Sequence, residues 1–242
     1  MFRETAGRSI LKAFSWRVSG TIATAGIVYF FTGRIKVAAV VGGFEFIGKM
    51  LIFFLHERFW DKVPYGRKEI VPFVVWFTGL PSSGKNAVAD EVHRRLKEKG
   101  FTAERLSGSR LRSLLPETGF SEEARNTHIR RVGILASILE KNKVTVIASF
   151  VSPYAESRKF ARGLCNNFIE VYVATPRPEC EKRDTQGLYA KARNGQVENF
   201  TGVNAPYDVP AHPEIIINTA ESPPEKCADA VMDFLYKRKW LQ

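Results

Sequence analysis

The residues best suited to chemistry form one short motif about a third of the way along the chain. Residues 79–85 read Gly-Leu-Pro-Ser-Ser-Gly-Lys, the spacing G-x-x-x-x-G-K, directly after the apolar run 71–78. Glycines let backbone N–H groups converge on phosphate oxygens, a following helix adds partial positive charge, and the lysine reaches the β- and γ-phosphates. The spacing therefore predicts a phosphate-binding loop (P-loop) that binds ATP through Gly79, Ser82, Ser83, Gly84, Lys85 and Asn86.

The residue after the lysine departs from this motif. Ser or Thr is expected there, because its hydroxyl binds Mg²⁺, and this chain has Asn86. An amide oxygen can ligate Mg²⁺, but the longer side chain must fit a tight octahedral shell. We therefore expect Asn86 to be the metal ligand, with weaker or altered metal binding.

The elements that position this loop alternate between strands and helices. Such alternation predicts a parallel sheet with helices on both faces, a three-layer α/β/α P-loop fold. The segment 187–213 is rich in Gly, Asn and Pro and is expected to be a loop that acts as a lid. The expected strands are 71–78, 101–107, 143–150, 167–175 and 214–219, and the expected helices are 86–99, 121–141, 153–164, 176–184 and 223–240.

Four further motifs follow the P-loop in order, and with it they make residues 72–242 resemble the adenylylsulfate (APS) kinase family. That family phosphorylates the 3′-hydroxyl of adenosine 5′-phosphosulfate with MgATP, in sulfate assimilation. The motifs are Gly119-Phe120-Ser121-Glu122-Glu123 with Ile129-Arg130-Arg131; Ser149-Phe150-Val151-Ser152-Pro153-Tyr154; Arg183-Asp184 with Gly187-Leu188-Tyr189 and Lys191-Ala192-Arg193; and Asn199-Phe200-Thr201-Gly202 with Ala205-Pro206-Tyr207.

The resemblance implies a role for each matched position. Arg112 and Arg125 would bind the phosphosulfate, a task suited to a forked guanidinium. Phe120 and Phe200 would sandwich the adenine, and His128 stands where the family has an asparagine that contacts APS. Arg183 would contribute to the ATP site, and the rest of the APS pocket would be Phe150, Val151, Ser152, Lys191 and Thr201.

The family's acidic segment is missing. The family carries an acidic D-G-D-N segment, followed by an arginine, after the second strand and uses its carboxylates for Mg²⁺ and for the attacking hydroxyl. Here Ser107 and Ser109 replace both aspartates, while Arg112 is kept. Serine carries no charge at neutral pH and is a poor base. Lys85 and Ser109 are therefore the expected catalytic positions, at a metal and base site that is altered.

Three functions stay open on these residues. The first is an APS kinase that converts ATP and APS to ADP and 3′-phosphoadenylyl sulfate with an adjusted metal site. The second is a catalytically impaired homologue that binds ATP or APS as a membrane sensor or scaffold. The third is a kinase for another small anionic nucleotide or sugar, which the APS-pocket motifs disfavour. Whether the chain is an enzyme is accordingly left open.

Residues 1–68 form a separate unit before the kinase-like domain, 69–242. Two apolar stretches, 18–33 and 37–55, are joined by a short turn with Arg34 and Lys36. Each is near the lower limit for crossing a bilayer. We expect a transmembrane helical hairpin, the alternative being a soluble hairpin packed on the second domain. Its ending, HERFW, resembles an uncharacterised family of two-helix membrane domains.

The charge distribution favours a membrane over nucleic acid. The formal net charge is +11, and residues 1–68 carry eleven Lys and Arg against four Asp and Glu. Because cations gather before the first stretch and after the second, both ends and the kinase-like domain are expected in the cytoplasm, at the inner membrane. No nucleic-acid-binding pattern is present. A homodimer is possible by family, and Cys165, Cys180 and Cys227 are expected to be reduced thiols without metal.

Overall fold

The computed structural model describes residues 6–62, 71–114 and 119–241. The chain divides into two compact units, Met1–Lys68 and Glu69–Gln242, and each is described by itself.

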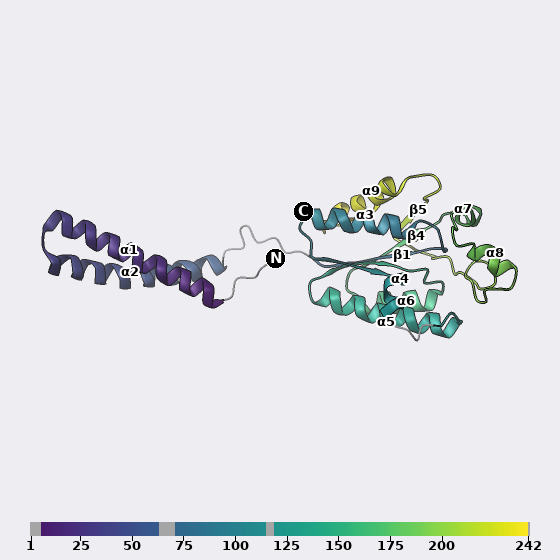
Figure 1. The fold of residues 1–242 in the computed structure, drawn as a ribbon, viewed down its shortest axis with the longest axis horizontal. Helices are drawn as coiled ribbons and strands as arrows, with labels where there is room; N and C mark the ends of the chain where they lie inside the picture. Colours follow the sequence, from purple (N-terminus) through teal and green to yellow (C-terminus); the bar gives the residue numbers. More distant parts are fainter. Residues whose placement is uncertain (1–5, 63–70, 115–118, 242) are drawn as a thin grey trace. The chain divides into compact units, whose positions relative to one another are not determined.

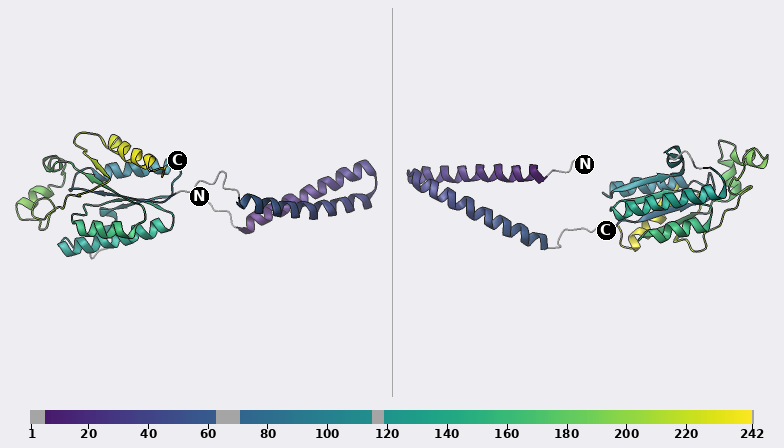
Figure 2. Two further views of the ribbon diagram at one scale, coloured as in Figure 1. Left: turned by 180° about the vertical axis from the view of Figure 1, so that it is seen from behind. Right: turned by 90° about the horizontal axis from the view of Figure 1, so that it is seen from below.

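The first unit is a helical hairpin, as the sequence predicts. Helix α1 (Ala6–Thr32) and helix α2 (Ile35–Lys62) contact each other, lying closest near the turn that joins them and diverging towards their other ends (Figures 1 and 2). Gly33 makes the turn with a φ of 63°, a conformation that favours glycine. Close packing occurs at Gly42, where an added Cβ would lie 3.5 Å from Thr21 Cγ2 and 3.6 Å from Ala25 Cβ. Small residues thus bring the two helices together.

Polar contacts inside the hairpin centre on one carboxylate. Glu45 pairs with Lys49 on its own helix and accepts a hydrogen bond from Thr24 Oγ1 of α1 at 3.0 Å. The outer surface of the hairpin is apolar, and the exposed side chains include Ile22, Phe30, Phe31, Phe44 and Ile47. A soluble surface rarely presents so many large apolar side chains together.

A bilayer crossing by this hairpin stays a prediction. Within the part of the chain that the structure describes, no helix combines the length and the apolar character that a membrane span requires.

The second unit is built on five parallel strands in the order β2-β3-β1-β4-β5. The central strand β1 pairs with β3 from Val74↔Val146 to Phe77↔Ser149 and with β4 from Val74↔Phe168 to Thr78↔Tyr172. The bounds are β1 Val74–Thr78, β2 Ala103–Ser107, β3 Thr145–Ser149, β4 Phe168–Val173 and β5 Ile215–Ile217. Because all strands are parallel, their carboxyl ends share one edge, where ligands bind in such folds.

Helices cover both faces of the sheet, which confirms the three-layer architecture (Figures 1 and 2). Helices α3 (Lys85–Glu98) and α9 (Pro224–Lys237) pack on one face, around Val75 and Phe77 of β1. Helices α4 (Gly108–Leu114), α5 (Glu122–Lys141) and α6 (Ala155–Leu164) pack on the other, around Val74 and Trp76. Successive residues of β1 thus alternate between two cores, as strand geometry requires.

Two short helices lie outside the expected pattern. Helix α4 follows β2 directly, and α8 (Leu188–Arg193) lies within the segment that the sequence predicts to be a loop. Gly187 precedes α8 with a φ of 66°, and Asp184 accepts a hydrogen bond from Tyr189 N at 2.8 Å. A six-residue helix is too short to show a periodic pattern, which explains why the sequence does not predict it. Helix α7 (Arg177–Lys182) completes the set and lies within the expected helix 176–184.

The close approach of α5 to α6 yields a test of the packing. A Cβ added at Gly133 would lie 2.8 Å from Ala161 Cβ and 3.0 Å from Ala161 Cα. We expect Gly133→Ala to lower the free energy of unfolding by about 1–3 kcal/mol, the usual cost of overpacking. Urea denaturation measures it, with Gly163→Ala as the control, because a Cβ at Gly163 meets no atom within 4 Å. Equal stability of the two variants would contradict the packing described.

Candidate functional site

The P-loop connects β1 to α3 and its shape is held by specific contacts. Gly79 has a φ of 152°, and a Cβ there would lie 2.7 Å from Val173 O. Gly84 has a φ of 83°, and a Cβ there would lie 2.9 Å from Thr219 Oγ1. The Ser83 carbonyl accepts hydrogen bonds from Thr175 Oγ1 at 3.1 Å and Thr219 Oγ1 at 2.9 Å. Both glycines are therefore required by the local geometry, and α3 begins directly behind the loop, as the motif predicts.

Lys85 lies folded against its own loop. Its side chain is 8% exposed, and Nζ donates to Leu80 O at 2.5 Å and to Ser83 Oγ at 3.2 Å. Burial lowers the pKa of the Lys85 ammonium to about 7. A phosphate beside Nζ would reverse this shift, since an anion stabilises the charged form.

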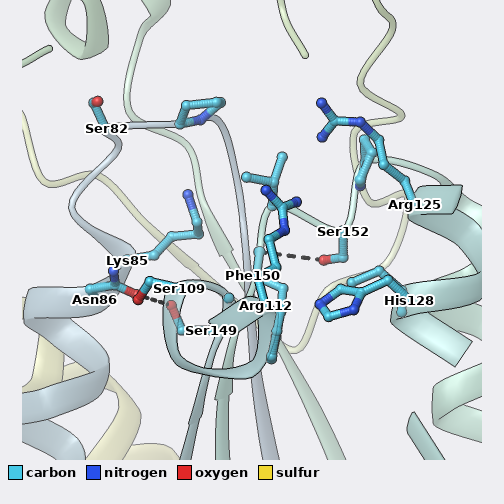
Figure 3. A pocket seen from close by; sticks show the side chains of 15 residues that line it. Ser82, Lys85, Asn86, Ser109, Arg112, Arg125, His128, Ser149, Phe150 and Ser152 are labelled. Carbon is cyan, nitrogen blue, oxygen red and sulfur yellow. Dashed lines mark hydrogen bonds between the residues drawn. The ribbon is translucent and has the colours of Figure 1, made fainter. Parts of the chain in front are cut away.

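One cavity of about 300 Å³ opens between the P-loop and helices α4 and α5 (Figure 3). It brings together ten of the predicted site residues from segments far apart in the sequence. Among its described lining residues there is no Asp or Glu, while lysine, arginine and histidine are all present. The predicted residues that line it are Ser82, Lys85, Asn86, Ser109, Arg112, Arg125, His128, Phe150 with Val151, and Ser152. Such a lining suits an anion.

Two arginines meet on one aromatic ring at the outer side of this cavity. The guanidinium of Arg112 lies 4.7 Å from the ring centroid of Phe120, and that of Arg125 lies 5.5 Å from it. Among the described residues, no carboxylate pairs with either arginine, and Arg112 Nε has no hydrogen-bond partner. Burial lowers the pKa of both guanidinium groups. Unpaired, partly desolvated guanidiniums are the groups that an oxyanion stabilises most.

Arg125 also connects helix α5 to the lid segment. Its NH2 group donates to Asn199 O at 2.7 Å, and its Nε donates to Phe120 O at 2.9 Å. Asn199 has a φ of 55°, and this turn places Phe200 in a separate cluster with Cys180 and Tyr189. Phe120 and Phe200 are thus both linked to Arg125 through the backbone, but neither lines the cavity.

His128 is the least conventional group in the cavity. Its side chain is 3% exposed, its ring lies edge-on to Phe150 with centroids 5.9 Å apart, and neither ring nitrogen has a partner among the described residues. Burial, with Arg112 and Arg131 nearby, lowers the pKa of the imidazole from 6.5 to about 4. His128 is therefore neutral at physiological pH and offers one donor and one acceptor.

The buried neutral histidine predicts a pH-dependent loss of stability. The unfolded chain binds a proton near pH 6.5 and the folded chain does not, so the contribution of His128 is complete above pH 6.5 and is lost as the pH falls towards 4. We expect the free energy of unfolding to fall by up to about 3 kcal/mol more in the wild type than in His128→Asn. Urea denaturation at pH 7 and pH 4 measures this difference. Identical pH profiles would show that His128 is not held neutral.

The cavity wall beyond β3 is held by a buried arginine that the sequence reasoning did not single out. Arg158 of α6 donates to Ser152 O at 2.7 Å and to Asp208 O at 2.7 Å, and its Nε lies 2.7 Å from Glu170 Oε1. Ser152 has a φ of 39°, so this turn needs external support. Arg158 thus joins the cavity wall to the end of the lid segment.

Asn86, the predicted metal ligand, has its side-chain oxygen surrounded by hydrogen-bond donors. Asn86 Oδ1 accepts hydrogen bonds from Ser149 Oγ at 2.6 Å and from Arg105 NH2 at 3.3 Å. Both lone pairs of the amide oxygen are therefore in use. No cluster of three His, Cys, Asp or Glu that could hold a metal occurs among the described residues. Asn86 in this position therefore does not fit the expected role of a Mg²⁺ ligand. Arg105 is the second residue that the sequence reasoning missed, and its position on the same side of β2 as Ser107 was the available signal.

The remaining predicted residues lie outside this cavity. Arg183 borders the outer side of the P-loop, donating to Thr219 Oγ1 at 2.8 Å and Thr219 O at 3.0 Å. Lys191 is exposed on α8, and Thr201 is buried, with no hydrogen-bond partner for Oγ1 among the described residues. The roles of these three residues stay predictions.

Comparison with known proteins identifies both units. Residues 71–218 match the family described as adenylylsulphate kinase, and residues 10–61 match a family described as predicted membrane protein (DUF2061). The adenylyl-sulfate kinase of Halothermothrix orenii is 44% identical over 168 residues, which cover 69% of this chain and 91% of that protein. The probable adenylyl-sulfate kinase of Pseudomonas aeruginosa is 43% identical over 161 residues, 66% of this chain and 75% of that protein.

A solved structure shares the fold. It is the Mycobacterium tuberculosis APS kinase in complex with AMPPNP and APS, which is 38% identical and superposes with a TM-score of 0.66 over 69% of this chain and 99% of that chain. Sequence motifs, fold and cavity thus agree with the comparisons, and the chain belongs to the adenylylsulphate kinase family, preceded by a unit of the predicted membrane protein family.

Proposed function

We propose that the chain is a membrane-tethered phosphotransferase that converts ATP and adenosine 5′-phosphosulfate to ADP and 3′-phosphoadenylyl sulfate. The observation that carries this proposal is the single cavity in which the P-loop lysine faces two arginines that have no carboxylate partner among the described residues. A phosphoryl donor and an anionic acceptor can therefore be held side by side. The family supplies the identity of the two substrates.

The residues divide the chemistry between them. The P-loop and Lys85 hold the phosphates of ATP, while Arg112 and Arg125 hold the phosphosulfate. The acceptor 3′-oxygen forms a bond to the γ-phosphorus as the bond to the β,γ-bridging oxygen breaks. No side chain in the described lining is a strong base, so the hydroxyl proton leaves to the phosphoryl oxygens or to solvent. A loose transition state needs little help from a base, which makes positioning the main contribution.

A second function is favoured by the same lining. The Ser107 and Ser109 positions supply hydroxyls where the family has carboxylates, and Asn86 has its oxygen occupied. Phosphoryl transfer depends on charge neutralisation, so these changes lower turnover more than binding. The second candidate is therefore an impaired homologue that binds ATP or APS at the membrane without turning them over.

A turnover assay separates the two candidates. The purified full chain is incubated with MgATP and APS, and the 3′-phosphorylated product is measured. Measurable APS-dependent formation of the 3′-phosphorylated product is the expected result and removes the second candidate. APS binding by calorimetry without product would overturn the kinase proposal and support the binding function.

Restoring two altered positions should raise the rate. In Ser109→Asp combined with Asn86→Ser, a carboxylate and a hydroxyl return to the positions where the family has them. We expect turnover to increase by about tenfold or more, since each added charge interaction in a desolvated site is worth a factor of this size. Ser113→Asp is the matched control, because Ser113 lies on the same helix α4, is exposed and does not line the cavity. Unchanged rates in the double variant would place the limitation elsewhere.

The proposed membrane tether is the first unit, residues 1–68. Support comes from the match of residues 10–61 to a predicted membrane protein family and from the exposed apolar side chains of α1 and α2. The cations that flank the two helices favour a cytoplasmic kinase domain. Residues 1–68 fused to a reporter enzyme should sediment with membranes and resist extraction with carbonate. A soluble fusion would refute the tether.

A further inference from the structure

The side-chain amide of Asn86, directly after the P-loop lysine, is held in one orientation by its hydrogen-bond partners. An asparagine oxygen and nitrogen are distinguished by their hydrogen-bond partners. Arg105 can only donate a hydrogen bond, so the atom that faces it at 3.3 Å must be the amide oxygen. Ser149 Oγ donates to the same oxygen at 2.6 Å, and Figure 3 shows this oxygen turned toward Ser149. A serine hydroxyl can donate or accept, so it is the Arg105 contact that excludes the flipped amide.

The partners of Asn86 are themselves firmly held. Arg105 lies 2.8 Å from Asp90 Oδ1 through Nε and donates to Leu106 O at 2.7 Å and to Ile147 O at 3.3 Å. Ser149 is buried at the end of β3, the strand paired with β2. Because these groups belong to the sheet edge and to helix α3, they hold the amide in one orientation.

The fixed oxygen of Asn86 leaves its amide nitrogen, Nδ2, without a described partner. Asn86 borders both the main cavity and the outer side of the P-loop, where it adjoins Lys85. Among the described residues nothing accepts a hydrogen bond from Asn86 Nδ2. With its oxygen bound to Arg105 and Ser149, the exposed side chain keeps two N–H donors without a described protein partner beside the P-loop.

We infer that Asn86 binds the nucleotide phosphate directly, as a hydrogen-bond donor, and that nucleotide binding by this chain is independent of Mg²⁺. This rests on the proposed function, since it assumes that the P-loop binds a nucleotide. A position that would hold a metal through a hydroxyl oxygen presents an amide N–H₂ instead. Charge on the phosphates is then balanced by Lys85 and the N-terminus of helix α3.

Calorimetry with ADP on the full chain, purified in detergent, tests the inference. We expect the Kd for ADP in EDTA to lie within about fivefold of the Kd in excess Mg²⁺, because no protein ligand to the metal is gained. A larger gain of affinity with Mg²⁺ would overturn the inference and leave the proposed function intact. No ADP binding under either condition would overturn the proposed function as well, so the two failures are distinguishable.

The isosteric variant Asn86→Asp tests directly whether the Asn86 N–H₂ group contacts the phosphate. It removes the N–H₂ donors, places a negative charge beside the phosphate and restores a metal ligand. We expect its ADP affinity in EDTA to fall by about tenfold or more and to recover with Mg²⁺, which also shows that the variant is folded. Asn142→Asp, the same change at the end of α5 before β3 begins, should match the wild type.

A second variant keeps the test decisive if Asn86→Asp does not fold. Asn86→Ser carries no charge but also lacks the amide donors, and its hydroxyl is a metal ligand. Its ADP affinity should likewise fall in EDTA and respond to Mg²⁺ by more than about fivefold. Wild-type affinity in EDTA for either folded variant would show that the Asn86 donors do not contact the phosphate.

Discussion

Lys85→Met is expected to reduce APS-dependent turnover by about three orders of magnitude and to weaken ATP binding by about tenfold or more. Lys85 is the only cationic residue of the motif 79–85, and its side chain is almost fully buried. Methionine preserves the length and packing of the side chain, so the variant should fold. Initial rates and calorimetry measure the two effects. Gly163→Ala, at an open position far from the site in sequence, serves as the unaffected control.

The pKa of Lys85 makes this prediction more specific. With a pKa of about 7 in the free protein, Lys85 loses its proton as the pH rises above 7, and phosphate binding restores it. ATP affinity of the wild type should therefore decrease above pH 7 by up to about tenfold per pH unit. The Lys85→Met variant should show no such slope. An equal slope in both proteins would show that another group titrates.

Arg112→Ala is expected to weaken APS binding by about ten- to a hundredfold and to leave ATP binding nearly unchanged. Hydrogen bonds between a guanidinium and an oxyanion are worth about 1.5–3 kcal/mol each, and Arg112 lies in the cavity with no hydrogen-bond partner for Nε among the described residues. Arg112→Lys should recover only part of the loss, because a point charge cannot bind two oxygens as a planar fork does. Calorimetry with each substrate separately gives both numbers.

A matched control lies two residues away. Arg110 is exposed on the same helix α4, does not line the cavity, and its closest described carboxylate partner, Glu104, is 3.6 Å away. Arg110→Ala should therefore bind APS as the wild type does. A parallel loss of ATP and APS affinity in Arg112→Ala would indicate damage to the P-loop side of the cavity and would refute a separate role in APS binding.

The sequence by itself determined the features that local patterns encode. The P-loop is a contiguous motif, and the alternation of apolar runs with amphipathic segments predicts a parallel sheet covered on both faces. The helical hairpin follows in the same way from two apolar stretches joined by a short turn. In each case the determining residues are neighbours in the chain, so spacing and periodicity are sufficient. The sequence does not predict the short helices α4 and α8, because one or two helical turns are too few to show a hydrophobic periodicity.

Only the tertiary structure decided what the site can do. Neither the strand order nor the cavity between the P-loop and helices α4 and α5 can be predicted from spacing, because both depend on pairings between distant segments. Asn86 meets Arg105 and Ser149 across 19 and 63 residues, and these two contacts fix the orientation of its amide and occupy its oxygen. Burial likewise makes His128 neutral and lowers the pKa of Lys85. Hydrogen-bond orientation and desolvation are properties of the packed chain, and residue type alone does not specify them.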